Sequence, residues 1–326
     1  MTPPRQTLTL LVLADPTAPQ LGMLGRLPEE TRIAVGNCAG AFQSAAPEGG
    51  VILCWFAARA LLEQVFEMAP RVRWVHSSSA GVDTLLFPAL VASPAPLTNS
   101  RGLFSAPLGE FALGAILFFA KGLRRMVGSQ AAGNWDPFDP EPVAGKTLGI
   151  VGCGDIGHAV AQRAHALGMK IIAVRRRPEL CRGDPLMHAV FPPQARREML
   201  ATSDYVVAAA PLTPETRGLI GEAELRAMKP SAVLINIGRG PVIDEPALVR
   251  ALEERWIRGA ALDVFQQEPL PAGHPFYRLE NLLLSPHCAD HTPGWMDRAM
   301  EFFLENFERF RQGEPLRNIV DKSLGY

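Results

Sequence analysis

Three side chains, Arg239, Glu268 and His287, together suit the reduction of a 2-keto acid. That reaction needs a cation to hold the substrate carboxylate, an acid to protonate the carbonyl oxygen, and a partner that orients the acid. Each residue follows a short apolar run that predicts a buried strand. Ends of parallel strands meet at one sheet edge, where ligands bind. A lone histidine is more often structural, but the combination predicts a catalytic set.

A glycine pattern, Gly-x-Gly-x-x-Gly, directly follows the β-type run 147–151 and opens a helical run. In such turns the first glycine allows a tight turn and the second lets the backbone approach a pyrophosphate. The third lets helix and strand pack closely, and the helix N-terminus presents N–H groups to the phosphates. A plain βα turn is the alternative. The predicted dinucleotide site comprises Gly152, Gly154, Asp155, Ile156 and Gly157.

Three consecutive arginines, Arg175, Arg176 and Arg177, end the next predicted strand. An NAD site is expected to carry an acidic residue about 20 positions beyond the fingerprint, but no carboxylate stands there. Guanidinium groups suit a dianionic 2′-phosphate, which they can grip with forked hydrogen bonds. A solvated basic turn is the alternative. We therefore predict NADP(H) as the favoured cofactor, with NAD(H) possible.

The composition indicates a soluble two-domain protein. The chain has 326 residues, with 48% hydrophobic and 20% charged residues and a net charge of −1, so neither nucleic acid nor an anionic membrane is an expected partner. The five cysteines form no Cys-x-x-Cys pair, and no His/Asp/Glu cluster has metal-ligand spacing. The run 8–14 reads as a buried strand rather than a signal peptide. We expect a cytoplasmic protein without a metal.

Strand-like and helical segments alternate along the chain, as in parallel βαβ units. After Gly145 six strands are expected, with helices between most of them, which predicts a doubly wound dinucleotide-binding sheet. Asp244 is the expected N-cap of one helix. The expected strands are 8–14, 51–55, 72–76, 147–151, 170–174, 205–209, 233–237, 260–264 and 282–284. The expected helices include 58–68, 156–167, 222–228 and 246–255.

The helical stretch 108–119 is apolar nearly all round, so it must be buried. The core of a large monomer and a subunit interface are equally good explanations. The apolar part, 111–120, is much shorter than the ~20 residues of a membrane span.

Several stretches, in order along most of the chain, resemble the D-isomer-specific 2-hydroxyacid dehydrogenases, a family that includes glyoxylate/hydroxypyruvate reductases. The resemblance implies a Rossmann cofactor domain, 101–289, inserted into a discontinuous flavodoxin-like substrate domain, 1–100 and 290–326. It also implies an active site in the cleft between them and a homodimer formed through the cofactor domains. The matching stretches are 145–152, 211–216, 236–240, 261–265 and 285–287.

Residue by residue, the resemblance assigns Arg239, Glu268 and His287 as the catalytic set. It assigns substrate-carboxylate binding to Ser79, Ala80 and Gly81. The further cofactor contacts that it implies are Pro211, Thr216, Ile237, Gly238, Arg239, Asp263, His287 and Ala289. Arg175 departs from the family pattern, in which many relatives carry aspartate, and this departure supports NADP(H).

The implied reaction is hydride transfer from the cofactor to a small 2-keto acid such as glyoxylate or hydroxypyruvate, giving the D-2-hydroxy acid. A dinucleotide-sensing scaffold without turnover is the alternative from another class. Formate dehydrogenase shares the fold, but that family has glutamine where Glu268 stands. Loops near Trp55, Ser78 and Trp295 are expected to contact the side group of the acid and so to determine which acid is bound. Trp135 is expected either to close the pocket or to pack.

Overall fold

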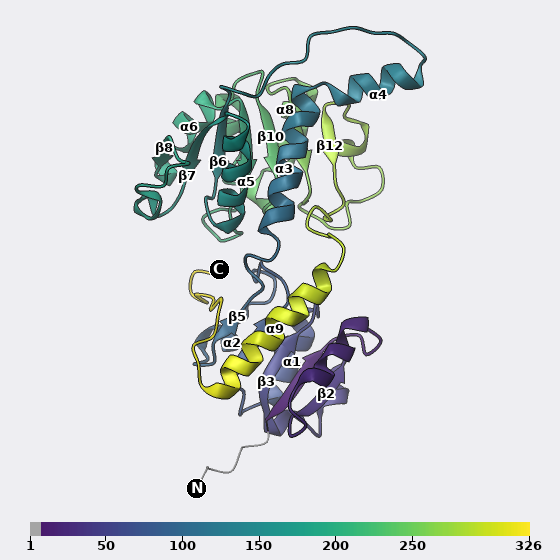
Figure 1. Ribbon diagram of the computed structural model, residues 1–326, viewed down its shortest axis with the longest axis vertical. Coiled ribbons are helices and arrows are strands. Elements are labelled where there is room, and N and C mark those ends of the chain that lie inside the picture. Colours follow the sequence, from purple (N-terminus) through teal and green to yellow (C-terminus); the bar gives the residue numbers. More distant parts are fainter. Residues whose placement is uncertain (1–7) are drawn as a thin grey trace. The chain divides into compact units, whose positions relative to one another are not determined.

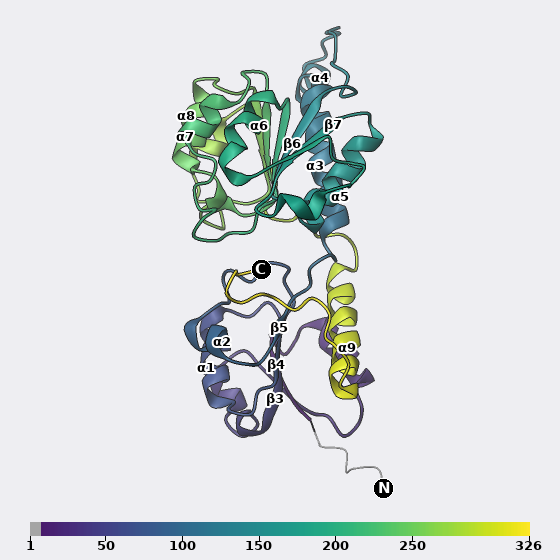
Figure 2. The same cartoon turned by 90° about the vertical axis from the view of Figure 1, so that its left-hand side faces the viewer.

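The computed structural model describes residues 8–326, which divide into two compact units. The first unit contains residues 8–103 and 293–326, and the second contains 104–292. Each unit has one parallel sheet with helices on both faces (Figures 1 and 2). This arrangement confirms the predicted fold class of two doubly wound parallel-sheet domains.

The first unit has five parallel strands in the order β2-β1-β3-β4-β5, which is the flavodoxin-like order. The short strands β2 and β5 at the two sheet edges were not among the predicted strands. Figure 2 shows α1 and α2 on one face of this sheet and α9 on the other. The elements are β1 (Thr9–Leu13), β2 (Arg32–Gly36), β3 (Gly49–Cys54), α1 (Arg59–Met68), β4 (Trp74–Ser77), α2 (Pro88–Ala92), β5 (Leu97–Thr98) and α9 (Trp295–Gln312).

The C-terminal helix α9 completes the first unit because its aromatic face covers the sheet. Phe303 stacks on Trp74 of β4, with ring centroids 5.5 Å apart, and Phe307 is fully buried beside them. The indole Nε1 of Trp74 donates to Thr98 Oγ1 at 2.8 Å. Burial of such large rings stabilises the unit by roughly 2–3 kcal/mol each relative to exposure. The chain therefore returns to its first unit after residue 292.

The second unit has seven parallel strands in the order β12-β11-β10-β9-β6-β7-β8. The prediction of six strands was wrong by one, since the edge strand β8 spans only three half-buried residues and has no long apolar run. Helices α3 and α5 cover one face, and α6, α7 and α8 cover the other (Figure 2). The strands are β6 (Thr147–Val151), β7 (Lys170–Val174), β8 (Ala189–Phe191), β9 (Tyr205–Ala208), β10 (Val233–Asn236), β11 (Gly259–Leu262) and β12 (Leu282–Leu284). The helices are α3 (Ser105–Ala120), α4 (Leu123–Ala131), α5 (Asp155–Ala166), α6 (Arg196–Thr202), α7 (Glu222–Ala227) and α8 (Glu245–Glu253).

Local sequence signals place several of these helices. Asp244 caps α8, because its Oδ1 accepts from the backbone N–H of Ala247 at 3.1 Å, which confirms the predicted N-cap. Helix α3 approaches α5 closely at Gly109, where an added Cβ would lie 3.1 Å from the carbonyl oxygen of Ala159. A side chain at that position would therefore push the two helices apart.

Helix α3 is only partly buried within the protomer. Its inner face, which includes Ile116, packs against α5 and β10. Leu113, Leu117 and Phe118 on the other side are half-buried. Within residues 8–326, α3 and α4 pass the length and composition test for a membrane span only as a pair bent by 63°, and no single helix passes it.

Candidate active site at the carboxyl edge of the cofactor-type sheet

The turn after β6 has the geometry expected of a dinucleotide fingerprint. Gly152 has φ of 93°, and a Cβ there would lie 2.5 Å from the Cα of Ala210, so only glycine fits this turn. A Cβ on Gly157 would lie 2.5 Å from the carbonyl oxygen of Gly152, which shows how closely α5 meets the strand. Gly154 faces open space instead. A pyrophosphate can therefore reach the backbone between a tight turn and the N-terminus of α5.

The three arginines follow β7 at the same edge of the sheet. The backbone N–H of Arg175 donates to the carbonyl oxygen of Phe191 and continues the pairing of β7 with β8. Its side chain is half-buried, whereas those of Arg176 and Arg177 are exposed. The pKa of the Glu215 carboxyl is lowered, first by a hydrogen bond with Thr213 and also by the charge of Arg176. Arg176 thus lies near the loop that follows β9.

That loop is held by its own hydroxyl groups. Thr216 Oγ1 donates to the carbonyl oxygen of Pro211 at 2.6 Å and accepts from the backbone N–H of Thr213 at 2.7 Å. These bonds close the segment 211–216 into a compact turn beside the phosphate-binding turn, because β9 is the neighbour of β6. The order of the sheet reverses between β6 and β9, and such a reversal is where dinucleotides bind.

Glu268 and His287 form the hydrogen-bonded pair that the sequence predicts. His287 Nδ1 lies 2.6 Å from Glu268 Oε2, and Glu268 Oε1 accepts from the backbone N–H of Phe265 at 2.8 Å. The hydrogen bond to Glu268 raises the pKa of His287 above its ordinary value, against the effect of burial. Burial acts to raise the pKa of Glu268, but the bonds with His287 and Phe265 outweigh it and the pKa falls. The pair therefore favours an imidazolium bound to a carboxylate.

Arg239 lies close enough to this pair for its charge to act on the pKa of both members. Its loop after β10 is fixed by Asn236, whose Oδ1 accepts from the N–H of Gly238 and whose Nδ2 donates to the carbonyl oxygen of Arg239, both at 3.1 Å. A Cβ on Gly240 would lie 1.9 Å from the carbonyl carbon of Phe265. The loops that carry Arg239 and Glu268 are therefore in direct backbone contact.

Asp263 anchors the loop that carries His287. The residue is 1% exposed, and its Oδ1 accepts from Ser285 Oγ at 2.6 Å and from the N–H groups of Cys288 and Ala289 at 3.0 Å each. His287 itself adopts φ of 52°, which is uncommon for a residue with a side chain. Three bonds to one buried carboxylate oxygen hold the loop in that conformation.

Sequence reasoning gave no role to Asn236 or Ser285. A signal existed for Asn236, because an asparagine two residues before a glycine at a strand end is typical of a turn closed by its side chain. No comparable pattern marks Ser285, since its bond to Asp263 spans 22 positions in the chain.

In the first unit, the predicted substrate loop follows β4. The carbonyl oxygen of Ser79 accepts from the N–H of Ser100 at 3.1 Å, and that of Ala80 accepts from Asn99 Nδ2 at 2.5 Å. Ser79 N–H donates to Ser77 Oγ at 3.2 Å. These bonds fix the loop through two carbonyl groups and the backbone N–H of Ser79.

An aromatic cluster begins directly after β3. Since Cys54 of β3 pairs with Ser77 of β4, the cluster and the predicted substrate loop lie at the same edge of the sheet. Phe56 packs edge-on against both Trp55 and Trp295, with ring centroids 5.2 and 5.4 Å apart. In the second unit the Trp135 side chain is 98% exposed, so it does not pack against the described part of its own protomer.

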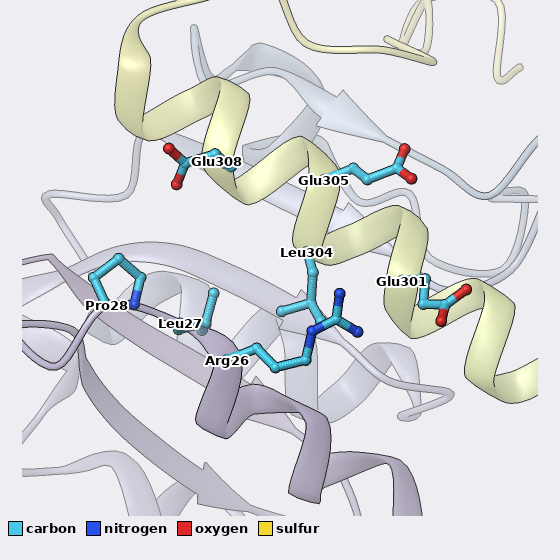
Figure 3. Close-up of a pocket in the computed structure, with 7 residues that line it drawn as sticks. All are labelled: Arg26, Leu27, Pro28, Glu301, Leu304, Glu305 and Glu308. Atoms are coloured by element: carbon cyan, nitrogen blue, oxygen red, sulfur yellow. The ribbon is translucent and has the colours of Figure 1, made fainter.

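A separate groove in the first unit lies between the 3-10 helix η1 (Pro19–Arg26) and α9 (Figure 3). None of the predicted site residues lines it. Its walls are Arg26, Leu27, Pro28, Glu301, Leu304, Glu305 and Glu308.

Comparisons with known proteins identify the family of the chain. Residues 113–289 match the family model of the D-isomer specific 2-hydroxyacid dehydrogenase, NAD binding domain. The chain is 37% identical over 272 residues to a glyoxylate reductase of Thermococcus gammatolerans, covering 80% of each chain. It is 36% identical over 270 residues to a glyoxylate reductase of Korarchaeum cryptofilum, again covering 80% of each.

Solved structures are similar over nearly the whole chain. A D-isomer specific 2-hydroxyacid dehydrogenase from Xanthobacter autotrophicus, in complex with NADPH and MES, gives a TM-score of 0.84 at 30% identity, covering 98% of this chain and 100% of that one. An NADPH-dependent glyoxylate/hydroxypyruvate reductase from Sinorhizobium meliloti, in complex with NADP and malonate, gives 0.81 at 25% identity, covering 98% of each. The chain therefore belongs to the D-isomer specific 2-hydroxyacid dehydrogenase family.

Proposed function

We propose that this protein is an NADPH-dependent reductase of a small 2-keto acid, with glyoxylate or hydroxypyruvate as the first candidate substrates. The observation that carries the proposal is the Glu268–His287 pair beside Arg239, on the sheet that holds the dinucleotide fingerprint. The named relatives support the substrate class, since those cited are glyoxylate reductases. They give no support to the alternative of a sensing scaffold.

In the proposed mechanism each residue has one task. Arg239 binds the substrate carboxylate. Protonated His287 donates its Nε2 proton to the keto oxygen, while Glu268 accepts a hydrogen bond from Nδ1 of the same ring and stabilises the imidazolium. When bound, the nicotinamide supplies the hydride that reaches the carbonyl carbon. General acid catalysis of this kind contributes about 10²–10⁴-fold.

For the cofactor, we propose that the fingerprint and the segment 211–216 bind the dinucleotide and that the arginine turn binds a 2′-phosphate. The open space at Gly154 and the half-buried Arg175 support this assignment. Asp263 is proposed to act by positioning the His287 loop, in addition to its predicted contact with the nicotinamide ribose or amide. The remaining predicted cofactor contacts lie beside the catalytic candidates. Ile237 and Gly238 precede Arg239 in its loop, and Ala289 follows His287 in its loop.

The direct test is oxidation of NADPH by the purified protein with glyoxylate, hydroxypyruvate, pyruvate, phenylpyruvate and oxaloacetate, with NADH in parallel. We expect turnover of glyoxylate or hydroxypyruvate and a higher kcat/KM with NADPH. Tight dinucleotide binding without turnover of any acid would contradict the enzyme assignment. A higher kcat/KM with NADH would contradict the cofactor assignment alone.

The pH dependence provides a separate prediction for Glu268. Reduction needs protonated His287, so kcat falls as pH rises through the pKa of His287, which lies above its ordinary value. The hydrogen bond that Glu268 accepts from His287 is the main cause of that elevation, with the charge of Asp263 adding to it and that of Arg239 opposing it. We therefore expect Glu268→Gln to move the falling limb of the pH profile of kcat to lower pH. An unchanged limb would show that Glu268 does not set the pKa.

We also propose a homodimer formed through α3 and α4. The outer side of α3 is half-buried, and α4 exposes Leu123, Met126 and Val127, the last at 65%. Exposed apolar side chains in one continuous region are typical of an interface. Sedimentation velocity is expected to give a dimer that Val127→Asp weakens; a monomeric wild-type protein would refute this.

We propose that the protein is cytoplasmic. Its five free cysteines support a reducing compartment.

A further inference from the structure

The turn after β7 brings a guanidinium group and two thiols together beside the phosphate-binding turn. Arg175 Nη1 donates to the Sγ of Cys181 at 3.2 Å. Cys181 ends the 3-10 turn η4 (Pro178–Cys181) and also forms a hydrogen bond with the thiol of Cys153. Cys153 stands between the first two glycines of the fingerprint. A chain of contacts therefore links the fingerprint to the side chain of Arg175.

Both thiols are buried, and Arg175 is half-buried. Burial is the main cause that raises the pKa of the Cys153 thiol to about 12, so this group stays neutral at physiological pH. A buried thiol that is neutral is inert as a nucleophile, and its chemical contribution is that of a weak hydrogen-bonding group. A structural or positioning task thus fits these cysteines better than redox chemistry.

The acceptor that holds Arg175 matters because it is a thiol sulfur and not a carboxylate. A carboxylate in the same place would neutralise the guanidinium and compete with an incoming phosphate. The sulfur of Cys181 accepts from only one of the five N–H donors of Arg175, so the positive charge stays available to an anion. Asp184, the carboxylate that also acts on Cys153, is instead paired with His158 Nε2 at 3.4 Å. Arg175 is therefore held in place without losing its charge.

We propose that Cys181 is a positioning residue for NADPH, whose thiol holds Arg175 in the orientation that receives the 2′-phosphate. The inference rests on the proposed NADPH preference and deepens it. Of the three arginines, it assigns the specific contact to Arg175. Arg176 and Arg177 are exposed and add positive charge to the turn.

The test compares two ligands that differ only in the 2′-phosphate, 2′,5′-ADP and 5′-AMP, by calorimetric titration of the full-length protein. Cys181→Val removes the acceptor and keeps a similar volume. We expect it to weaken 2′,5′-ADP roughly three- to tenfold, the size of one ordinary hydrogen bond, because sulfur is a weak acceptor, and to change 5′-AMP less than about twofold. Cys181→Ser, which keeps an acceptor, is expected to restore most of the loss. The matched control is Cys38→Ser, which changes an exposed thiol of the first unit.

Each other outcome is decisive. Equal weakening of both ligands would show a merely structural role for Cys181 and overturn the inference. A wild-type protein that prefers 2′,5′-ADP, with an equal preference in Cys181→Val, would overturn the inference and leave the NADPH preference intact. A wild-type protein without any preference would overturn both. Should circular dichroism show that the valine variant is unfolded, Cys181→Ala replaces it with the same expected result.

Discussion

Replacement of His287 by alanine is expected to lower kcat for keto-acid reduction by at least about 100-fold, the lower bound for loss of a general acid. The reason is that His287, whose pKa is raised chiefly by its hydrogen bond with Glu268, is the proposed proton donor, and alanine has no proton to donate. The dissociation constant of NADPH, measured by fluorescence titration, should change little, because the fingerprint and the arginine turn are untouched.

Two controls separate lost chemistry from a damaged loop. His287 has φ of 52°, a conformation that asparagine tolerates better than alanine does. His287→Asn therefore preserves the backbone and removes the acid, and we expect the same loss of kcat. His165→Ala, which removes an exposed histidine from the last turn of α5, should leave kcat unchanged. Near-normal turnover in His287→Asn would refute the assignment of His287.

Replacement of Arg239 by alanine is expected to raise KM for the keto acid by about 30-fold or more. Loss of one partner from a hydrogen-bonded charge pair typically costs ~2–5 kcal/mol, and tenfold corresponds to ~1.4 kcal/mol. The expected effect is on the acid rather than on the cofactor, because Arg239 lies beside the Glu268–His287 pair. Steady-state kinetics with each substrate varied in turn will measure it.

The matched variants for this prediction are Arg239→Lys and Arg226→Ala. Lysine keeps the charge but loses the forked geometry, so an intermediate KM is expected. Arg226 is an exposed arginine of α7 that pairs with Glu222 at 2.8 Å, and its loss should not change KM. If Arg239→Ala leaves both KM and kcat unchanged, the substrate carboxylate is bound elsewhere.

Much of the second unit could be predicted from its sequence. The limits of β6 and β7 agree with the apolar runs that predicted them, because a buried parallel strand must be apolar on both faces. The edge strand β8 was missed, since an edge position needs no such run. The contact between Cys181 and Arg175 was missed as well, because the thiol meets the guanidinium group only when η4 folds back onto the carboxyl end of β7.

The sequence by itself determined the fold class and marked the fingerprint, Arg239, Glu268 and His287 as candidates, because these depend on residue type and on position after a strand. Only the tertiary structure decided how these groups interact. The 2.6 Å bond between His287 and Glu268 spans 19 positions, and Asp263 fixes a loop more than 20 positions away. Such distances between side chains depend on strand order and loop closure, which no local pattern encodes. The protonation preference of His287 follows from that geometry.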